Sequence, residues 1–514
     1  MSLRIRRNNF SVNSEIYVKA FVTRIQNNRH YASVGVFKRN CVKLACEFTA
    51  RYSYRAFFYK GAHMLYVVIR IMYHIMAKKR LFNNALKNDW ISTATVDSQP
   101  VNEKFNGFGV AITGSSCYEL STMSPEHRDA FLEDIYGRDG LNLSVARLSM
   151  GSSDYSPFMY SYCDTPGDTE LKTFSVDMEK EYIIPMIKEA LKHNPYLEFL
   201  ASPWSPPGWM KTGGLLSCGY MRDKYIDCYA DYFVKYISSY GAEGINISAV
   251  TPQKNEPESH QKGTSVACIW SPDTEAKFII KLRETMDKNG INTKIWMYDH
   301  NFIGWPRIVW TLNEYPQLSE CVDSVALHYY EGGIELVDNI KAAYPDMKWN
   351  FTEGGPRLYD NYGTDWVKWS LIMARSLAHG CESFFGWCLL LDEDGGPNIS
   401  PFGCAGLATR NSQTGELTYS GQYHAFKHFS KFIKRGAKIY PVNISENCSE
   451  LCNFPNGFNK PIEAVAADNT DGSHVIIMVN TNDAKKQVQY FYDNKWWYAE
   501  LMPQSVSTIV FKED

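Results

Sequence analysis

Residues 245–258 read I-N-I-S-A-V-T-P-Q-K-N-E-P-E, a short apolar run that leads into polar side chains. The run from Ile245 to Val250 has the length and composition of a buried β-strand. An amide and a carboxylate, Asn255 and Glu256, follow it closely. A strand that delivers such groups at its end predicts a site at the edge of a sheet, so the fold depends on how many similar units the chain contains.

Short apolar runs alternate with amphipathic stretches from residue 108 onward, which is the pattern of repeated βα units. We expect eight strands, at 108–112, 143–148, 197–202, 245–250, 294–298, 324–328, 349–352 and 382–390. Between them, residues 223–240 show helical spacing of apolar side chains, and Ser124-Pro125 and Ser271-Pro272 are typical of helix starts. Eight βα units predict a (β/α)8 TIM barrel of the α/β class, with its active site at the carboxyl ends of the strands.

Polar side chains fall where that rule places an active site. The side chains that end a predicted strand or closely follow one are Arg147, Asp154, Trp204, Trp209, Asn255, Glu256, Asp299, His300, His328, Tyr330 and Glu353. In a barrel they would surround one mouth, and Glu256 and Glu353, at strands four and seven, would face each other across it.

Two facing carboxyl groups suit hydrolysis of a glycosidic bond, in which one protonates the leaving oxygen and the other attacks or activates water. A solvated surface charge is the commoner state of a single Glu, but both of these residues follow apolar strands. Arg147, Asn255, His328 and Tyr330 would then position hydroxyl groups and hold one carboxylate ionised.

Trp209 lies in the Pro/Gly-rich stretch 203–214, where either stacking on a sugar ring or packing of the loop explains it. We interpret His300 and His328 as hydrogen-bonded structural histidines rather than metal ligands, because no H-E-x-x-H pattern occurs. The acidic run 392–394 lacks the alternating ligands of a calcium loop, and the glycines at 107–109 miss the dinucleotide fingerprint. We therefore expect no metal ion and no cofactor.

The chain of 514 residues is long enough for a large domain and a smaller one. Residues 1–88 hold 17 of the 53 Lys and Arg residues but two of the 56 Asp and Glu residues, so the remainder is acidic. An acidic body argues against nucleic-acid binding. We interpret residues 1–88 as a basic, poorly ordered extension; membrane contact is expected, if anywhere, only through the apolar run 64–76, which is too short to span a bilayer.

Thirteen Cys residues, scattered singly, indicate reduced thiols rather than a disulfide framework. Cys448 and Cys452 have a ligand-like spacing but no matching cluster, which argues against zinc. No signal-peptide pattern stands at residue 1. These features favour a cytoplasmic protein, with an exported or lysosomal one as the alternative, and they leave the oligomeric state open.

Five short β-type runs follow residue 421, at 462–467, 474–480, 487–493, 496–501 and 505–511. Turn residues separate them, which predicts a small antiparallel β-sandwich over residues 422–514. We interpret residues 89–105 as a linker and a strand that joins this domain, and residues 106–421 as the catalytic barrel.

Seven ordered motifs resemble glycoside hydrolase family 30, the glucosylceramidase-like group. They are F-N-G-F-G-V-A-I-T-G (105–114), A-R-L-S-M-G-S-S-D-Y-S (146–156), L-A-S-P-W-S-P-P-G-W-M-K-T-G-G (200–214), N-E-P (255–257), A-L-H-Y-Y (326–330), F-T-E-G-G (351–355) and L-L-L-D-E-D-G-G-P-N (389–398). The resemblance begins near residue 102. It implies a retaining hydrolase of the glucosylceramidase or β-1,6-glucanase kind, acting on a β-linked carbohydrate or glycolipid.

The same resemblance implies roles for individual residues. It makes Glu256 the acid/base and Glu353 the nucleophile. The residues that it places in the sugar subsite are Asp154, Trp209, Asn255, His328, Tyr330, Trp387 and Asn398.

Three features depart from the family pattern. Lys254 is one residue more than the usual T-x-Q-N-E-P and could bulge the strand end before the acid/base. Cys388 stands where relatives have an amide, and the loop after Glu353, E-G-G-P-R-L-Y-D, differs near the subsites. The insertion at Lys254 keeps an alternative open, a catalytically silent carbohydrate-binding protein on the same barrel.

Overall fold

The computed structural model describes residues 2–6, 15–26, 29–33, 36–37, 91–254, 265–399, 403–445 and 462–513. The chain forms two compact units. The barrel unit consists of Asp97–Pro441 with Ala467–Thr470, and the sheet unit consists of Met1–Val96, Val442–Ala466 and Asp471–Asp514.

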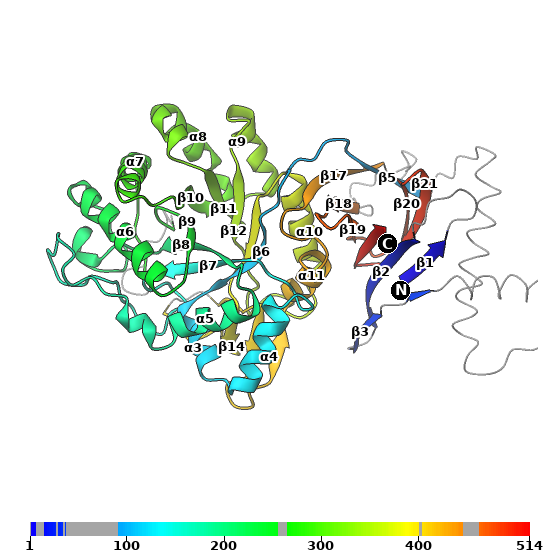
Figure 1. Cartoon of the computed structure of the whole chain (residues 1–514), viewed down its shortest axis with the longest axis horizontal. Helices are drawn as coiled ribbons and strands as arrows, with labels where there is room; N and C mark the ends of the chain where they lie inside the picture. The colour runs from blue at the N-terminus through cyan, green and yellow to red at the C-terminus, as the bar shows by residue number, and fades with distance from the viewer. Residues whose placement is uncertain are drawn as a thin grey trace, which may run out of the picture. The chain divides into compact units, whose positions relative to one another are not determined.

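Eight parallel strands close the barrel unit (Figure 1), in the order β10-β11-β12-β13-β6-β7-β8-β9. Their bounds are β6 Gly107–Ile112, β7 Val145–Met150, β8 Glu198–Pro203, β9 Ile247–Val250, β10 Lys294–Asn301, β11 Ser324–His328, β12 Trp349–Glu353 and β13 Ser383–Gly386. Every residue of β6, β11 and β12 is buried, because helices cover the outer face of a barrel strand and packed side chains fill the interior. The predicted TIM barrel is confirmed.

All eight predicted strands are present, and the last of them shows the largest difference in length. The predicted strand 382–390 is too long, because β13 ends at Gly386 and Leu390–Asp392 form a separate strand, β14. β14 pairs with β15 (Ala408–Arg410), which pairs with β16 (Leu417–Tyr419), in a three-stranded sheet. One apolar run thus spans two elements, and composition alone cannot divide it.

Helices surround the strands in Figure 1. Their bounds are α3 Gly114–Ser121, α4 Pro125–Tyr136, α5 Ile183–His193, α6 Ile226–Ala242, α7 Pro272–Lys288, α8 Trp305–Glu314, α9 Val337–Ala343, α10 Trp366–Ala378 and α11 Gly421–Phe429. Ser124 and Ser271 accept hydrogen bonds from backbone N–H groups in the first turns of α4 and α7, and a proline follows each. Both predicted helix starts are confirmed. Helix α6 begins three residues later than predicted, because Asp223–Tyr225 form a 3-10 turn.

The strands of the sheet unit follow one another in the order β21-β20-β5-β17-β18-β19-β22-β2-β1-β4. Those after residue 90 are β5 Ile91–Val96, β17 Lys438–Ser445, β18 Ile462–Asp468, β19 His474–Asn480, β20 Lys486–Tyr492, β21 Lys495–Leu501 and β22 Ser505–Glu513. One core cluster combines side chains of β18, β19 and β22 with side chains of β5, β20 and β21. Two parts of the strand path therefore pack against each other as in a sandwich, and the predicted β domain is confirmed.

Four strands lie within the segment for which the sequence predicts poor order: β1 Ser2–Arg6, β2 Glu15–Gln26, β3 Arg29–Ser33 and β4 Val36–Phe37. Strand β2 pairs antiparallel with β22. Residues 38–90, which include the apolar run 64–76, lie outside the described residues, so the prediction for the segment as a whole stays a prediction. Among the residues that the structure does describe, no helix has the length and apolar character needed to cross a membrane.

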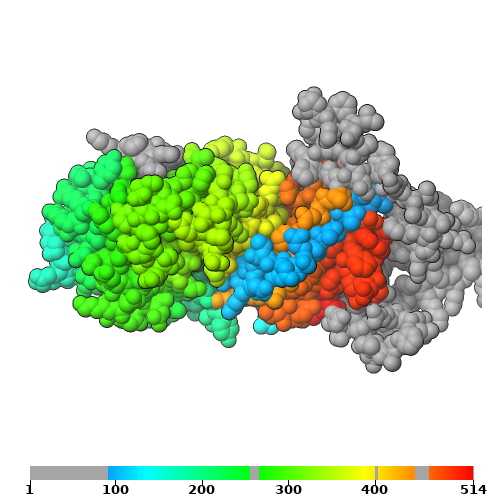
Figure 2. Space-filling model, turned by 90° about the horizontal axis from the view of Figure 1, so that it is seen from above, coloured from blue at the N-terminus to red at the C-terminus, as the bar shows by residue number. Residues whose placement is uncertain are grey.

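The unit boundaries differ from the predicted ones at residues 105 and 421. Backbone N–H groups of Asp97, Val101 and Phe105 donate to carbonyl groups between residues 437 and 441, which ties both segments into the barrel unit. Figure 2 shows the first segment, in blue, lying along the chain drawn in orange. Helix α11 packs against α10 and therefore also belongs to the barrel unit.

A buried carboxyl group joins the loop after β7 to helix α6. Glu179 is 1% exposed and accepts hydrogen bonds from the hydroxyl groups of Tyr160 at 2.7 Å, Tyr162 at 2.9 Å and Tyr240 at 2.5 Å. Burial raises the pKa of Glu179 to about 7, although the three hydrogen bonds favour the anion. Ionisation of this group near neutral pH therefore works against folding.

Replacing Glu179 by Gln is expected to flatten the pH dependence of stability. The folded-state pKa, about 7, lies above the ordinary value of 4.5, so the contribution of this group is complete below about pH 4.5 and is lost as the pH rises through 7. At about 1.4 kcal/mol per pKa unit, wild-type protein should lose roughly 3 kcal/mol more than the variant over this range. Denaturant titrations near pH 4.5 and near pH 8 measure the difference, with exposed Glu181→Gln as the control. Identical pH dependence in wild type and Glu179→Gln would contradict the prediction.

Candidate active site

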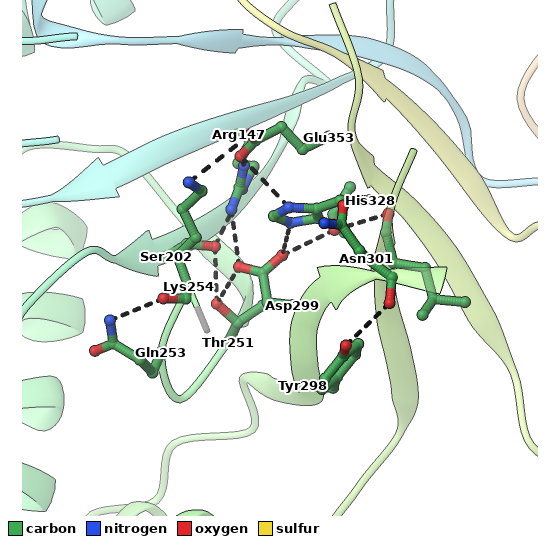
Figure 3. A network of polar contacts seen from close by, with 12 residues as sticks. Arg147, Ser202, Thr251, Gln253, Lys254, Tyr298, Asp299, Asn301, His328 and Glu353 are labelled. Carbon is green, nitrogen blue, oxygen red and sulfur yellow. Dashed lines mark hydrogen bonds and ion pairs between the residues drawn. The ribbon is translucent and has the colours of Figure 1, made fainter. Parts of the chain in front are cut away.

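Arg147, in β7, is a buried cation with two carboxylate partners (Figure 3). Its Nη1 donates to Glu353 Oε2 at 2.5 Å, and its Nη2 donates to Asp299 Oδ2 at 2.8 Å. Its Nε donates to the hydroxyl oxygen of Ser202 at 3.2 Å. One guanidinium therefore joins the carboxyl ends of β7, β8, β10 and β12, which is where the barrel rule places an active site.

Asp299 is the acceptor at the centre of this network. Besides Arg147, the hydroxyl groups of Thr251 and Thr352 and the Nε2 of His328 each lie 2.8 Å from its carboxylate oxygens and donate to them. Burial alone would raise the pKa of Asp299, but the nearby charge of Arg147 and these hydrogen bonds hold it far below its usual range. Asp299 is therefore ionised at any pH at which the protein would work.

The backbone at Asp299 is strained. Tyr298 and Asp299 have φ angles of 79° and 58°, in the left-handed region that non-glycine residues rarely adopt. The pairing of β10 with β11 shifts register at this point. Such strain costs on the order of 1–3 kcal/mol per residue and persists only where surrounding contacts demand it. Here the irregular backbone carries the Asp299 carboxylate, which accepts the hydrogen bonds from Arg147, Thr251, Thr352 and His328.

Glu353, the predicted nucleophile, ends β12 and is 3% exposed. Its Oε2 is bound by Arg147 and lies 3.9 Å from His328 Nδ1, while its Oε1 lies 4.0 Å from Lys254 Nζ. Burial raises the pKa of this carboxyl, but Lys254, His328 and Arg147 outweigh burial and lower the pKa to about 2. The carboxylate is thus ionised and oriented without any substrate.

The predicted acid/base region is only partly described. After β9 the chain continues beside β8, since Thr251 N donates to Ala201 O at 3.0 Å and Lys254 N donates to Pro203 O at 2.8 Å. Lys254 is 5% exposed and faces Glu353. Asn255 and Glu256 lie outside the described residues, so their roles, and the effect of the Lys254 insertion on Glu256, stay predictions.

Three aromatic side chains, Tyr155, Trp204 and Trp387, form a cluster beside Arg147 that we call the aromatic floor. The rings of Trp204 and Trp387 stack with centroids 5.4 Å apart, and Tyr155 meets Trp387 edge-on at 5.8 Å. The guanidinium carbon of Arg147 is 4.9 Å from the Trp204 ring centroid, within cation–π range. Cys388 is fully buried in the same cluster, so this departure from the family pattern changes the packing behind the floor.

Tyr330 is the second residue after β11, and the loop after Glu353 reaches it. The guanidinium carbon of Arg357 lies 5.1 Å from the Tyr330 ring centroid. Burial and the nearby carboxylate of Glu353 raise the pKa of Tyr330 well above 10, so its hydroxyl keeps its proton. The loop after Glu353, which departs from the family pattern, therefore borders Tyr330, a predicted subsite residue.

Two further predicted subsite residues belong to loops that are joined by backbone contact. Asp154 is 7% exposed, and its carbonyl oxygen accepts a hydrogen bond from Ile399 N at 2.9 Å. The neighbouring Asn398 donates from Nδ2 to the Gly395 carbonyl at 2.7 Å, which shapes its own loop. The structure thus brings the loop after β7 next to the loop that follows β14.

Trp209 lines a pocket of about 390 Å³. Its indole N–H donates to the Cys163 carbonyl at 2.8 Å, and its ring meets Tyr225 edge-on at 5.1 Å. Two other residues of the pocket lining, Met159 and Leu216, also pack against the Trp204–Trp387 cluster. The pocket therefore adjoins the aromatic floor. Trp209 packs within its own loop and also lines this pocket.

Sequence reasoning noted the position of Asp299 but did not give it a role. Asp299 has the same feature in the sequence as Glu353, which is a carboxylate at the end of an apolar strand. The hydroxyl groups of Ser202, Thr251 and Thr352, which complete the network, carry no such signal because Ser and Thr are common at strand ends. Among the described residues, no group of His, Cys, Asp and Glu side chains is arranged to hold a metal ion.

Comparison with known proteins agrees with this geometry. The family model of the glycosyl hydrolase family 30 TIM-barrel domain matches residues 105–433. An endo-1,6-beta-D-glucanase of Neurospora crassa is 29% identical over 404 residues, which cover 75% of this chain and 81% of that protein. The lysosomal acid glucosylceramidase of Mus musculus is 26% identical over 402 residues, which cover 74% and 75%. A solved structure of an endo-beta1,6-glucanase is 30% identical, with a TM-score of 0.72, and the match covers 81% of this chain and 93% of that one.

A TIM barrel with an ionised, buried glutamate at the end of its seventh strand fits the class of glycoside hydrolases, which use a pair of carboxyl groups at the active site. The chain belongs to glycosyl hydrolase family 30. It is a β-glycosidase, and its substrate is a carbohydrate or a glycolipid. None of these comparisons supports the alternative of a catalytically silent binding protein.

Replacing Asp299 by Asn should destabilise the barrel, because Arg147 would then be buried with one carboxylate instead of two. Removing one partner of a buried ion pair costs about 3–5 kcal/mol. The exposed pair of Asp223 and Lys277 provides the control, since exposed pairs contribute little. Denaturant unfolding should show a large loss for Asp299→Asn and a small one for Asp223→Asn. Losses of equal size would contradict a central role for Asp299.

Proposed function

We propose that this protein hydrolyses β-linked glucosides by double displacement, with retention of configuration at the anomeric carbon. The observation that carries the proposal is the state of Glu353, which is bound through one oxygen by Arg147 at 2.5 Å and kept ionised by the cations around it. A carboxylate that is ionised and oriented before the substrate arrives is what nucleophilic attack requires.

In the first half-reaction, Glu353 attacks the anomeric carbon while the acid, which we assign to Glu256, protonates the leaving oxygen. In the second, Glu256 takes a proton from water, the water attacks the same carbon, and Glu353 leaves as a carboxylate. Asp299 takes part in neither bond change. It holds Arg147 and His328, and Arg147 in turn holds Glu353.

We assign the other predicted residues to two regions of the cleft. Asp154, His328, Tyr330, Trp387 and Asn398 belong to the sugar subsite, where Tyr330 has a hydroxyl that keeps its proton. The pocket at Trp209 adjoins the aromatic floor, and we assign it to the leaving-group side, where it would receive the next sugar or the aglycone.

We infer that a β-1,6-linked glucan is the substrate. The match at 30% identity to a structure of an endo-beta1,6-glucanase, and the relative of that name at 29%, support this choice. A glucosylceramide is the second candidate, supported by the 26% identical glucosylceramidase, and it would place the protein in sphingolipid metabolism. Parallel hydrolysis assays on a β-1,6-glucan and on glucosylceramide in detergent micelles distinguish the two. Faster turnover of glucosylceramide would overturn the glucan assignment.

Replacing Glu353 by Gln should lower kcat by roughly 10⁴-fold or more, because it removes the nucleophile while keeping the shape of the side chain. The assay is hydrolysis of an aryl β-glucoside, with proton NMR of the anomer that forms first from the wild type. We expect the β-anomer first. Glu382→Gln, on a half-buried glutamate at the opposite end of the barrel strands, is the control. An active Glu353→Gln variant, or α-anomer as the first product, would contradict the proposal.

Replacing Trp209 by Ala should raise KM for a β-1,6-linked oligosaccharide by about tenfold and leave KM for a small aryl glucoside nearly unchanged. Loss of an aromatic stacking surface removes on the order of 1 kcal/mol of binding, which applies only to substrates that fill the pocket. Trp310, an exposed residue of α8, supplies the matched control Trp310→Ala. An equal rise in KM for both substrates would indicate loop damage instead of a lost subsite.

A further inference from the structure

Lys254 is a buried cation beside the carboxylate that performs the attack. It is 5% exposed, and its Nζ lies 4.0 Å from Glu353 Oε1 and 5.3 Å from the centroid of the Trp204 ring. Figure 3 shows the amino group pointing toward Glu353 from the chain that follows β9. The bulge expected from the insertion stays a prediction. Independently of it, Lys254 brings a basic side chain into the site.

The backbone around Lys254 fixes this direction. Lys254 N donates to the Pro203 carbonyl at 2.8 Å, and the Lys254 carbonyl accepts from Gln253 Nε2 at 2.9 Å. Gln253 Nε2 also donates to the Trp204 carbonyl at 2.6 Å. These contacts hold residues 253 and 254 against the end of β8, and the lysine side chain from there reaches both the Trp204 ring and Glu353.

The ionisable groups near Glu353 are Arg147 of β7, Lys254 after β9, His300 of β10, His328 of β11, Tyr330 after β11 and Cys404 before β15. Asp299 of β10 lies behind Arg147. Arg147 and Lys254 thus place two basic side chains beside Glu353. Glu353 loses its charge whenever it forms an ester with the sugar, and the attraction between Lys254 Nζ and this carboxylate is then lost.

We propose that Lys254 is a positioning residue that sets the balance between the two half-reactions by favouring Glu353 as a free carboxylate over Glu353 as a glycosyl ester. This inference rests on the double displacement proposed above. When Glu353 attacks, its oxygen forms a bond to the anomeric carbon, and the electron pair of the old glycosidic bond leaves with the aglycone oxygen, which receives the proton of the acid. The ammonium opposes this step because the negative charge beside it disappears.

In the second half-reaction the effect has the opposite sign. Water adds to the anomeric carbon and gives its proton to the base, while the electron pair of the ester bond returns to Glu353 Oε1 or Oε2. Lys254 stabilises the carboxylate that is leaving, so it speeds this step. An enzyme with this lysine should therefore accumulate little glycosyl ester, and one without the charge should accumulate more.

The test compares wild type with Lys254→Met, which keeps the length of the side chain and removes its charge, and with Lys254→Arg, which keeps the charge. Stopped-flow hydrolysis of 4-nitrophenyl β-glucoside reports both half-reactions. We expect the ratio of the glycosylation rate constant to the deglycosylation rate constant to rise at least about tenfold in Lys254→Met, with a burst of nitrophenolate close to one per active site. Lys254→Arg should restore most of the wild-type ratio.

The pH profile gives a second readout, which loss of packing alone would not move. The pKa of Glu353 is lowered in part by Lys254, so the acidic limb of kcat/KM should shift upward by about one pH unit or more in Lys254→Met and remain near its wild-type position in Lys254→Arg. If Lys254→Met does not fold, Lys254→Gln takes its place. A full burst already present in the wild type would overturn the proposal without any variant.

Failure of this inference is distinguishable from failure of the proposed function. Retention in the wild type and an inactive Glu353→Gln, together with an unchanged burst and acidic limb in Lys254→Met, would overturn the role of Lys254 and leave the double displacement intact. Inversion in the wild type would overturn both.

Discussion

The guanidinium of Arg147, enclosed between the carboxylates of Asp299 and Glu353, is the interaction on which the rest of the site depends. A buried cation is tolerated only where paired charges and hydrogen bonds replace the water that it has lost. Its partners belong to β10 and β12, and Glu353 is 206 residues away in the sequence. They meet only because eight strands close into a barrel. Closure of the barrel thus brings these charged side chains together. Their ion pairs in turn constrain the positions of the strand ends.

The same network prepares the chemistry. Asp299 accepts four hydrogen bonds on a strained backbone, which fixes both Arg147 and His328, and Arg147 orients Glu353 before any substrate is present. Preorganised charge of this kind does not have to rearrange during the reaction, which is the main electrostatic advantage of an enzyme over water. The pocket at Trp209, which we assign to the leaving-group side, would add binding surface away from the reacting bond. Lys254, the residue in excess of the usual family motif, adds a second basic side chain beside Glu353.

Much of this could be predicted from the sequence, for reasons visible in particular residues. Barrel strands such as β11 are continuous apolar runs with polar residues at their ends, so both the strand and His328 stood out. Glu353 and Arg147 were found because each ends or lies within such a run. The central role of Asp299 is not predictable from the sequence, because a left-handed bulge leaves no mark in composition. The split of 382–390 into β13 and β14 was missed since both pieces are apolar. The cage of tyrosines around Glu179 depends on contacts across 61 residues, from Tyr240 to Glu179, that no local pattern encodes.

Membership of the family accounts for the TIM barrel, and individual residues at its mouth determine the chemistry of this chain. Covalent capture by Glu353 is the central claim, and trapping it is the most direct test. The protein would be inactivated with an activated 2-deoxy-2-fluoro-β-glucoside, digested and examined by mass spectrometry. The account predicts one fluoroglucosyl group on the peptide that contains Glu353. A label on any other carboxylate, or active hydrolysis with no covalent label, would contradict it.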